Sequence, residues 1–348
     1  MSSIYEVARQ AGVSAATVSR TFRTPDKLSQ ETRRHVLDVA ARLNYTPRRH
    51  TPEAGTGAGA VETAQSVGFF FFTADSDSGR LNDFYAPVMM GAQAEASQAG
   101  MTLTLRTASR YEGPAEPIPS FRAQEVAGAL LVGAALPDVL AAYDAPGLPA
   151  VLVDNRDETG RRDCILSDGF GGAGAATRSL LELGHRRIAF VQDEATAPSF
   201  RDRRNGYLCA LWEAGIIPQA PWVVSTPRRV PLEPFVQALR ALPEPPTAIV
   251  AANDVIGFGL LTACRALGLC VPQDVSIVGF DDTAFSVHAY PALTTVRVDK
   301  EQMGRLAVRQ LLTRIAEAQS EAGQLPAAHL IVPVSLVERD SCAPPPSP

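Results

Sequence analysis

The sequence has few cysteines, no long apolar run and no signal core. Its five cysteines are odd in number and lack close paired spacing, so neither a disulfide framework nor a zinc site is indicated, and we expect no metal or cofactor. The longest apolar run, around residues 67–72, is far too short to cross a bilayer. Because no apolar signal core lies near residue 1, we expect a soluble cytoplasmic protein without a membrane partner.

Basic residues are concentrated at one end of an otherwise acidic chain. The 348 residues, 46% of them apolar, are enough to bury a large core in two or three domains. The net charge is −5, yet residues 1–50 carry nine Lys and Arg against four Asp and Glu. Such a local basic excess predicts a module that binds phosphate groups, attached to an acidic body.

The first 22 residues predict two short helices that cross steeply. Ser3 and Glu6 have the spacing of a capping box, and Gly12 ends the first helix. Ser14 then caps a second helix over 15–22 after a break of only two or three residues, which is the geometry of a helix-turn-helix. The apolar face of the first helix consists of Val7, Ala8 and Ala11.

A third helix is expected from Ser29 to Tyr45, behind a turn at Pro25 and Asp26, with Pro47 beyond its end. Apolar residues at helical spacing should close a three-helix core: Val36, Leu37, Ala40 and Leu43. An ordinary helical hairpin with a solvated charged face is the alternative. Caps, turn and charge together favour a DNA-reading headpiece.

The rest of the chain alternates between short apolar runs and helical patterns. Strands are expected at 68–72, 102–105, 128–132, 149–153, 187–191, 248–251 and 275–280. Helices are expected at 86–99, 172–183, 203–214 and 256–267. This alternation predicts two α/β lobes with parallel sheets, facing each other across a crevice at the carboxyl ends of their strands.

Composition sets the expected domain boundaries. Residues 49–65 are rich in Pro, Gly, Thr and Ala and predict a mobile hinge or linker between a DNA-binding domain at 1–48 and a body at 66–340. The Pro-rich segment 341–348 is expected to be a disordered tail.

Motifs dispersed in order along the chain resemble those of the LacI/GalR family of bacterial transcription regulators. In the headpiece they are Ile4-Tyr-Glu-Val-Ala8, Ala11-Gly-Val-Ser14, Thr17-Val-Ser-Arg20, Leu43-Asn-Tyr45 and Pro47. In the body they are Asp83-Phe-Tyr85, Leu183-Gly-His185 with Ile188, Arg201-x-Arg203 before Gly206-Tyr207, Ala252-Asn-Asp254, Val278-Gly-Phe-Asp-Asp282, Pro291-x-Leu-Thr-Thr295 and Pro333-Val-Ser-Leu336.

The resemblance implies an N-terminal all-α helix-turn-helix headpiece and an α/β periplasmic-binding-protein-like body of two doubly wound parallel-sheet lobes. It further implies a homodimeric repressor that binds double-stranded DNA at a palindromic operator and responds to a small polar effector, often a carbohydrate. No heptad run follows Arg339, so we expect a dimer and no tetramer. The sequence leaves open whether the effector releases DNA or strengthens binding.

By the same resemblance, the second helix enters the major groove. Ala15, Ala16 and Arg20 would face base edges, and an arginine that binds guanine O6 and N7 discriminates by about 1–3 kcal/mol. Short hydroxyl side chains would contact phosphate oxygens, or simply cap helices: Ser14, Thr17, Ser19 and Ser29. Arg23 stands where the family usually has asparagine. It is expected either to contact a DNA phosphate or to make no contact with DNA.

The hinge departs from the family pattern. Family members insert a leucine from a hinge helix into the minor groove, but the matching residue here is Ala54. Pro52 and Gly55 disfavour that helix by roughly 3 and 1 kcal/mol. We therefore expect a flexible arm whose basic residues contact the minor groove or the DNA backbone: Arg48, Arg49 and His50.

The family's effector-binding positions correspond to Asp154 in the first lobe and to Arg203, Asn253 and Asp281 in the second. Two carboxylates, an amide and an arginine fork can form hydrogen bonds with several hydroxyls or with a polar ring, so we expect a sugar or a similarly polar effector. An apolar or stacking wall is expected from Phe84 and Tyr85. The alternatives are that Asp154 and Asp281 cap loops and that Arg203 forms a surface ion pair with Asp202. Asp254 and Asp282 are expected to cap helices or loops.

Two apparent motifs are interpreted as structural. Gly169-x-Gly171-x-x-Gly174 matches a dinucleotide fingerprint, but no strand runs directly into it, so we expect a helix start capped by Asp168. His185 has no nucleophile at motif spacing and is expected to pack or cap. No catalytic set is predicted. A transporter's solute-binding protein, an α/β enzyme, and a cytoplasmic sugar-binding protein without DNA regulation remain the competing functions.

Overall fold

The structure is a computed structural model that describes residues 4–14, 17–18, 21, 30–42, 66–73, 81–109, 126–133, 140, 148–157, 159–193, 198–227, 230–320 and 326–346. The chain divides into two compact units, residues 1–61 and 62–348, and each is considered by itself. The expected hinge and its basic residues Arg48, Arg49 and His50 lie outside the described residues.

The smaller unit contains helices α1 (Ile4–Gln10) and α3 (Gln30–Arg42), with helical residues at 17–18 and 21 between them. Gly12 ends the first helix with a φ of +63°, as expected. Its core is formed by Val7, Ala8, Ala11, Val18, Val36, Val39 and Ala40. The expectation that Leu37 closes this core is wrong, because 37% of it is exposed. Val39, one helical turn after Val36, takes that place.

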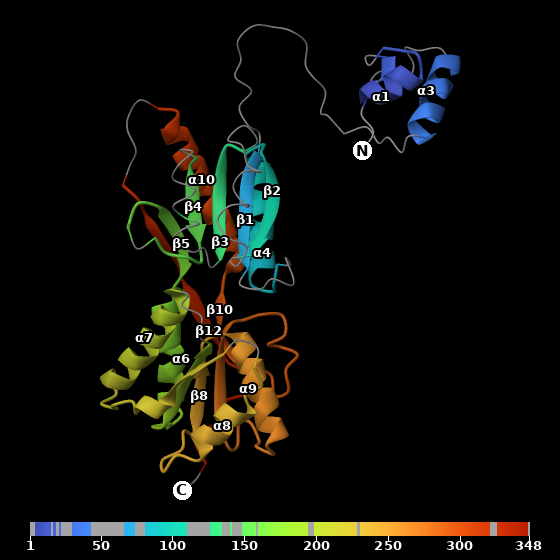
Figure 1. Cartoon of the computed structure of the whole chain (residues 1–348). Coiled ribbons are helices and arrows are strands. Elements are labelled where there is room, and N and C mark those ends of the chain that lie inside the picture. Colours follow the sequence, from blue (N-terminus) through green and yellow to red (C-terminus); the bar gives the residue numbers. More distant parts are fainter. Residues whose placement is uncertain are drawn as a thin grey trace. The chain divides into compact units, whose positions relative to one another are not determined.

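The first lobe of the larger unit, lobe 1, contains a six-stranded sheet in the order β11-β5-β4-β3-β1-β2. Its strands are β1 (Ser66–Thr73), β2 (Thr102–Ser109), β3 (Gly128–Gly133), β4 (Ala150–Val153), β5 (Asp163–Ser167) and β11 (His329–Val332), all parallel. Helices α4 (Tyr85–Gln98) and α10 (Lys300–Ala318) belong to the same lobe (Figure 1).

The second lobe, lobe 2, repeats this plan with the order β12-β10-β9-β8-β6-β7. Its strands are β6 (Ile188–Asp193), β7 (Val223–Thr226), β8 (Ala248–Ala251), β9 (Ser276–Asp281), β10 (Thr294–Val298) and β12 (Val334–Val337). Its helices are α6 (Gly169–Glu182), α7 (Pro198–Glu213), α8 (Glu233–Arg240), α9 (Asp254–Ala266) and the short 3-10 helix η2 (Ala220–Trp222). Figure 1 shows α6 and α7 on one side of this sheet, with α8 and α9 on the other.

The two sheets confirm the predicted parallel architecture, with β12 as an antiparallel edge. The chain passes between the lobes three times: from β5 to α6, from β10 to α10, and from β11 to β12. Neither lobe is therefore a continuous piece of sequence. Helices α8 and α10 and strands β5, β7, β10, β11 and β12 are not among the elements predicted from the sequence.

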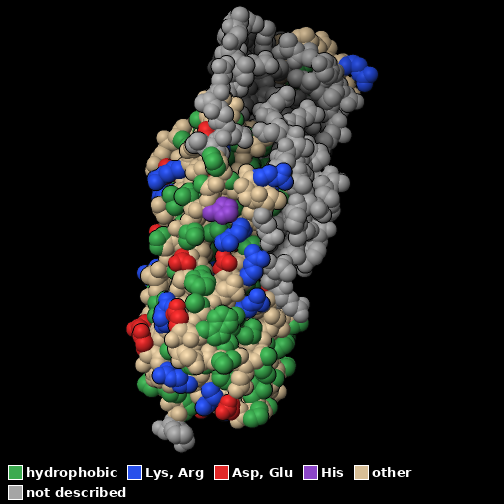
Figure 2. All heavy atoms as spheres, turned by 90° about the vertical axis from the view of Figure 1, so that its left-hand side faces the viewer, with side chains coloured by type: hydrophobic (Ala, Val, Ile, Leu, Met, Phe, Trp, Pro, Cys, Tyr) green, Lys and Arg blue, Asp and Glu red, His purple; other side chains and the backbone are tan. Residues whose placement is uncertain are grey.

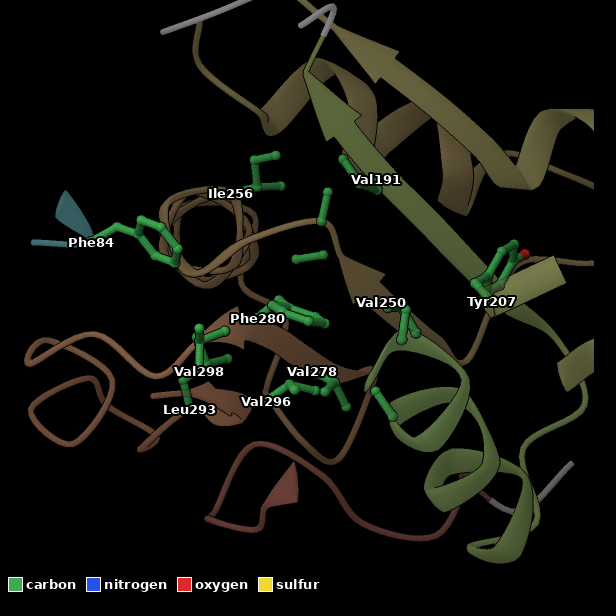
Figure 3. Close-up of a cluster of buried hydrophobic side chains, with 14 of the residues drawn as sticks. Phe84, Val191, Tyr207, Val250, Ile256, Val278, Phe280, Leu293, Val296 and Val298 are labelled. Carbon is green, nitrogen blue, oxygen red and sulfur yellow. The ribbon is translucent and has the colours of Figure 1, made fainter. Parts of the chain in front are cut away.

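One buried cluster runs through both lobes. Figure 3 shows its lobe 2 part, where Tyr207 and Phe280 lie among strand valines, and it also labels Phe84 of lobe 1. Phe84 is 8% exposed and belongs to the same cluster as Ile256. The lobes therefore share apolar contacts close to the expected effector residues.

The expected disordered tail at 341–348 is wrong for residues 341–346, which the structure describes. Ser341 is fully buried, and its hydroxyl donates to the Ile277 carbonyl at 2.6 Å. The Ala343 carbonyl lies 2.9 Å from Nε2 of His185. The segment is held because its polar groups satisfy those at the base of lobe 2, which composition does not reveal. Among the described helices, none is both long and apolar enough to cross a membrane.

Candidate functional site

All six predicted effector residues lie where strands of the two lobes end toward each other or at the start of the adjoining helices. Asp154 directly follows β4 of lobe 1, and Asp281 is the last residue of β9 in lobe 2. Phe84 and Tyr85 begin α4, and Arg203 lies in α7. The carboxyl ends of the strands in both sheets meet at the boundary between the lobes, called the cleft below, and such strand ends are where parallel sheets bind ligands.

Lobe 1 contributes a carboxylate held by a phenol. The Tyr85 hydroxyl donates to Oδ2 of Asp154 at 2.7 Å, while Oδ1 of Asp154 is buried and has no hydrogen-bond partner. The Tyr85 ring meets those of Phe71 and Phe84 at 4.8 and 5.0 Å between centroids. The expected aromatic wall is therefore packed, and beside it Asp154 keeps one buried acceptor unpaired.

Lobe 2 contributes a buried arginine with both terminal nitrogens occupied. Arg203 is 3% exposed, donates from Nη1 to the Ala252 carbonyl at 2.6 Å and from Nη2 to Oδ1 of Asp281 at 3.0 Å. Its guanidinium stacks over the Phe280 ring at 3.8 Å. Nε of Arg203 has no partner. The alternative of a surface ion pair with Asp202 does not hold, because Asp202 pairs with Arg156 instead.

Three aspartates of the site adopt left-handed backbone conformations. The φ values are 55° for Asp154, 115° for Asp281 and 48° for Asp282. Non-glycine residues seldom adopt these conformations, and such strain persists where the surrounding structure enforces it, often at ligand sites. Hydrogen bonds from Tyr85 and Arg203 hold the carboxylates of Asp154 and Asp281 in place.

The adjacent polar residues are structural. Oδ1 of Asn253 caps α9 by accepting from the Ile256 N–H at 3.0 Å. Asp254 is fully buried and ties the loop after β9, which confirms its expected capping role. Asp282 pairs with Arg297 and Arg339, each at 2.6 Å, so it acts through ion pairs more than as a cap.

Burial shifts the acid–base behaviour of the cleft. Loss of hydration raises the pKa of Asp281 to about 7, although Arg203 opposes the shift. Loss of hydration likewise raises the pKa of Asp154, and the charge of Arg203 across the cleft lowers it in part. The two lobes are therefore coupled electrostatically through Arg203.

We expect the free energy of unfolding to fall as the pH rises from about 4 to 7. In this window the folded state holds a proton on Asp281 that the unfolded state, with its ordinary pKa of 3.8, has released, so raising the pH favours unfolding. Urea unfolding between pH 5 and 8 would measure this slope. Asp281→Asn should remove most of it, and parallel pH profiles for both proteins would contradict the assignment.

Unpaired polar atoms gather around this cleft. Seven buried side-chain atoms lack a hydrogen-bond partner among the described residues. Five of them belong to residues that follow β4, lie in the last two positions of β5 or β6, or lie in α7: Asp154, Arg156, Ser167, Gln192 and Arg203. Leaving such an atom unpaired costs about 1–3 kcal/mol. Their concentration here indicates a site completed by a polar ligand.

Two residues that join the lobes are absent from the predicted site. Arg156, two residues after Asp154, pairs with Asp202 of α7 at 3.0 Å. Lys300, at the start of α10, donates to the carbonyls of Asp281 and Asp282 at the end of β9, and its Nζ lies 5.9 Å from the centroid of the Phe84 ring. Neither residue carries a local signal, because each finds its partner only when the lobes meet.

The two motifs interpreted as structural are confirmed. Asp168 caps α6 by accepting from the Gly171 N–H at 2.7 Å, and Gly169 packs against α7. His185 is 1% exposed, with Nδ1 at 2.8 Å from the Thr247 hydroxyl, and is a packed residue. Within the part of the chain that the structure describes, no group of His, Cys, Asp and Glu has the arrangement of a metal site.

Of the predicted DNA-contacting residues, the structure describes Ser14 and Thr17. The Ser14 hydroxyl accepts from the Thr17 N–H at 3.1 Å, which confirms the predicted cap of the second helix. Both side chains are solvent-accessible. The other predicted DNA-contacting residues lie outside the described residues: Ala15, Ala16, Ser19, Arg20, Arg23, Ser29, Arg48 and Arg49.

Sequence comparison finds a known domain in each unit. Residues 3–48 match the bacterial regulatory proteins of the lacI family, and residues 177–342 match a periplasmic binding protein-like domain. The HTH-type transcriptional repressor PurR of Erwinia tasmaniensis is 30% identical over 352 residues, covering 99% of this chain and 97% of the relative. The probable HTH-type transcriptional repressor ExuR of Bacillus subtilis is 29% identical, covering 93% and 95%.

Solved structures agree over nearly the whole chain. A complex of the transcriptional regulator CelR with cellobiose has a TM-score of 0.70 and 29% identity, covering 98% of this chain and all of that one. The lac repressor dimer bound to operator and the anti-inducer ONPF has a TM-score of 0.67 and 27% identity, covering 98% and 99%. The similarity includes both the headpiece and the two-lobed body.

Proposed function

Because the chain belongs to the lacI family of bacterial regulatory proteins, we propose that it is a repressor whose operator affinity is set by a small polyhydroxylated effector, a sugar or sugar derivative. Proteins of this family are DNA-binding transcriptional regulators, and this chain has their helix-turn-helix headpiece and two-lobed body. The operator is palindromic and the active species is a homodimer, as in the dimer of lac repressor on its operator.

The cluster of unpaired polar atoms in the cleft carries the effector proposal. Oδ1 of Asp154 needs a donor and Nε of Arg203 needs an acceptor, and a hydroxyl group supplies both. Several hydroxyls on one ring satisfy both lobes at once. Asp281 and the amide nitrogen of Asn253, whose side-chain oxygen caps α9, complete the set. The relative solved with cellobiose supports a carbohydrate of this kind.

The mechanism follows from the two lobes. An effector held by Asp154 of lobe 1 and Arg203 of lobe 2 favours one lobe arrangement by its differential affinity for that arrangement. The lobes of a dimer hold two headpieces, so a change of lobe angle changes headpiece spacing against half-sites about one helical turn apart. These steps involve no covalent reaction and require no cofactor.

The direct test is binding of the purified full-length protein to DNA from its own locus, at a stated salt concentration, with and without a panel of neutral sugars, sugar acids and purines. A saturable palindromic site whose affinity shifts with a sugar supports the proposal. A shift with a purine alone would overturn the effector class. Sugar binding without any specific DNA site would favour a sugar-binding protein that does not regulate DNA.

Arg20→Ala is expected to weaken operator binding by about 1–3 kcal/mol, roughly 5- to 150-fold, because the proposed guanine contact is lost. Binding to DNA of unrelated sequence should change little beyond the effect of one positive charge. Titration of both DNAs at the same salt concentration makes the comparison. Equal losses on the two DNAs would assign Arg20 to the phosphate backbone.

A further inference from the structure

Arg156 and Asp202 form a salt bridge that connects the two lobes across the cleft. Arg156 follows β4 of lobe 1, Asp202 lies in α7 of lobe 2, and Nη2 of the arginine is 3.0 Å from Oδ2 of the aspartate. Figure 2 views the side on which α6 and α7 lie in Figure 1, and basic and acidic side chains gather at mid-height on this face. The two side chains are 33% and 26% exposed.

The lobe 2 end of this bridge is rigidly mounted. A Cβ on Gly206 would overlap the Phe170 carbonyl, so α7 and α6 touch at the level of their backbones. Asp202 lies in the turn of α7 before this contact, with its Cβ 3.5 Å from the position a Cβ would take on Gly169. The next residue, Arg203, is fixed by Asp281 and Ala252.

The lobe 1 end is rigid too. The Arg156 N–H donates to the side chain of Asn155 at 2.9 Å. The next residue, Asp157, is buried, accepts from the Thr159 hydroxyl at 2.6 Å and pairs with Arg162 at 3.2 Å. A salt bridge between two flexible side chains moves freely, whereas one between two fixed backbones restricts how the backbones are oriented.

We propose that the Arg156–Asp202 salt bridge is a latch that holds the lobes in the arrangement of this structure before any effector binds. In this arrangement Phe84 of lobe 1 is buried within the apolar cluster that runs through both lobes, and Lys300 of lobe 1 donates to the Asp281 and Asp282 carbonyls of lobe 2. The latch adds an electrostatic bias to these contacts. Under the proposed function it sets the effector-free operator affinity, and it gives that affinity a dependence on salt separate from DNA binding itself.

The test measures lobe separation directly and requires neither operator nor effector. Spin labels are placed on the exposed Cys270 of lobe 2 and on a cysteine introduced as Ser97→Cys at the exposed end of α4, with Cys209 and Cys342 replaced by serine. Labelled chains are diluted with unlabelled protein, so that distances within one chain dominate the double electron–electron resonance signal.

Arg156→Asp and Asp202→Arg should each lower the population of the present arrangement, relative to that of more separated lobes, about two- to fivefold. This is the size of effect expected for a partly exposed ion pair. The charge-reversed double variant Arg156→Asp/Asp202→Arg should restore the original distances. Raising NaCl to 0.5 M should shift the distance distribution of the wild type toward more separated lobes, because salt screens the ion pair. The distribution of Arg156→Gln, which lacks the pair, should not change with salt. Arg178→Gln, which breaks the Arg178–Glu213 pair within lobe 2, is the matched control and should change nothing.

Unchanged distances in both single variants, or a charge reversal that fails to restore them, would overturn the latch. A wild-type distance distribution that does not change with NaCl concentration would also overturn it. These outcomes leave the proposed function standing, because effector-dependent operator binding is measured in a separate experiment. Loss of sugar response with an intact latch would instead count against the proposed function.

Discussion

Arg203→Met is expected to abolish the response to effector and to lower the free energy of unfolding by about 3–5 kcal/mol, the usual result of removing one partner from a buried ion pair. The substitution removes the donors to Asp281 and Ala252 and the unpaired Nε in the cleft. Urea unfolding and DNA binding with the sugar that shifts the wild type would measure both effects.

The pH dependence of this loss identifies its cause. Without Arg203 the Asp281 carboxylate loses its main opposing charge, so the loss of stability should be larger above pH 7 than at pH 5, where Asp281 is protonated. Arg203→Lys keeps the charge but not the two-nitrogen fork and should recover part of the stability without the effector response. Arg204→Met, next along α7, is the matched control. An effector response in Arg203→Met would remove this residue from the site.

Asp254→Ala is expected to destabilise lobe 2 by about 3 kcal/mol or more, because it leaves several buried donors unpaired. Oδ2 of Asp254 accepts from the Thr283 N–H at 2.8 Å and from the Ser286 hydroxyl at 2.6 Å. Oδ1 accepts from the Thr295 hydroxyl at 2.6 Å. The residue joins α9 to the loop after β9 and to β10, so its loss releases the loop that follows Asp281.

Denaturant unfolding measures this effect. Asp254→Asn keeps one acceptor and should lie between the wild type and Asp254→Ala. Asp340→Ala removes an exposed carboxylate and should change the free energy of unfolding by less than about 0.5 kcal/mol. If Asp254→Ala unfolded like the control, the carboxylate would not be what holds the loop. The loop leads directly from the cleft, so weaker effector binding should accompany the loss of stability.

Local patterns account for what sequence reasoning predicted correctly. Apolar runs such as 68–72 and 248–251 form buried strands because a strand covered on both faces needs apolar side chains in succession. The Ser14 and Asp168 caps were predicted because a cap acts within three residues. The effector residues were placed by resemblance, and the structure brings Asp154, Arg203 and Asp281 to one cleft, where their role remains a proposal.

The errors arise where local patterns cannot decide. Leu37 fits the helical spacing of the headpiece core as well as Val39 does, and only packing against α1 selects Val39. The last residues are Pro-rich like many disordered tails, yet Ser341 and Ala343 complete the hydrogen bonds of lobe 2. Helix α10 was missed even though its 19 residues make it the longest helix described.

The sequence by itself determined the class of fold, the positions of most strands and helices between residues 66 and 281, and a basic helix-turn-helix segment, because periodicity, caps and charge act over a few neighbouring residues. Tertiary structure alone decided that the chain passes between the lobes three times, that Asp281 is buried beside Arg203, and that Arg156 meets Asp202 from 46 residues away. Such pairings carry no local pattern, because they form only when packing brings distant segments together and removes water from between them.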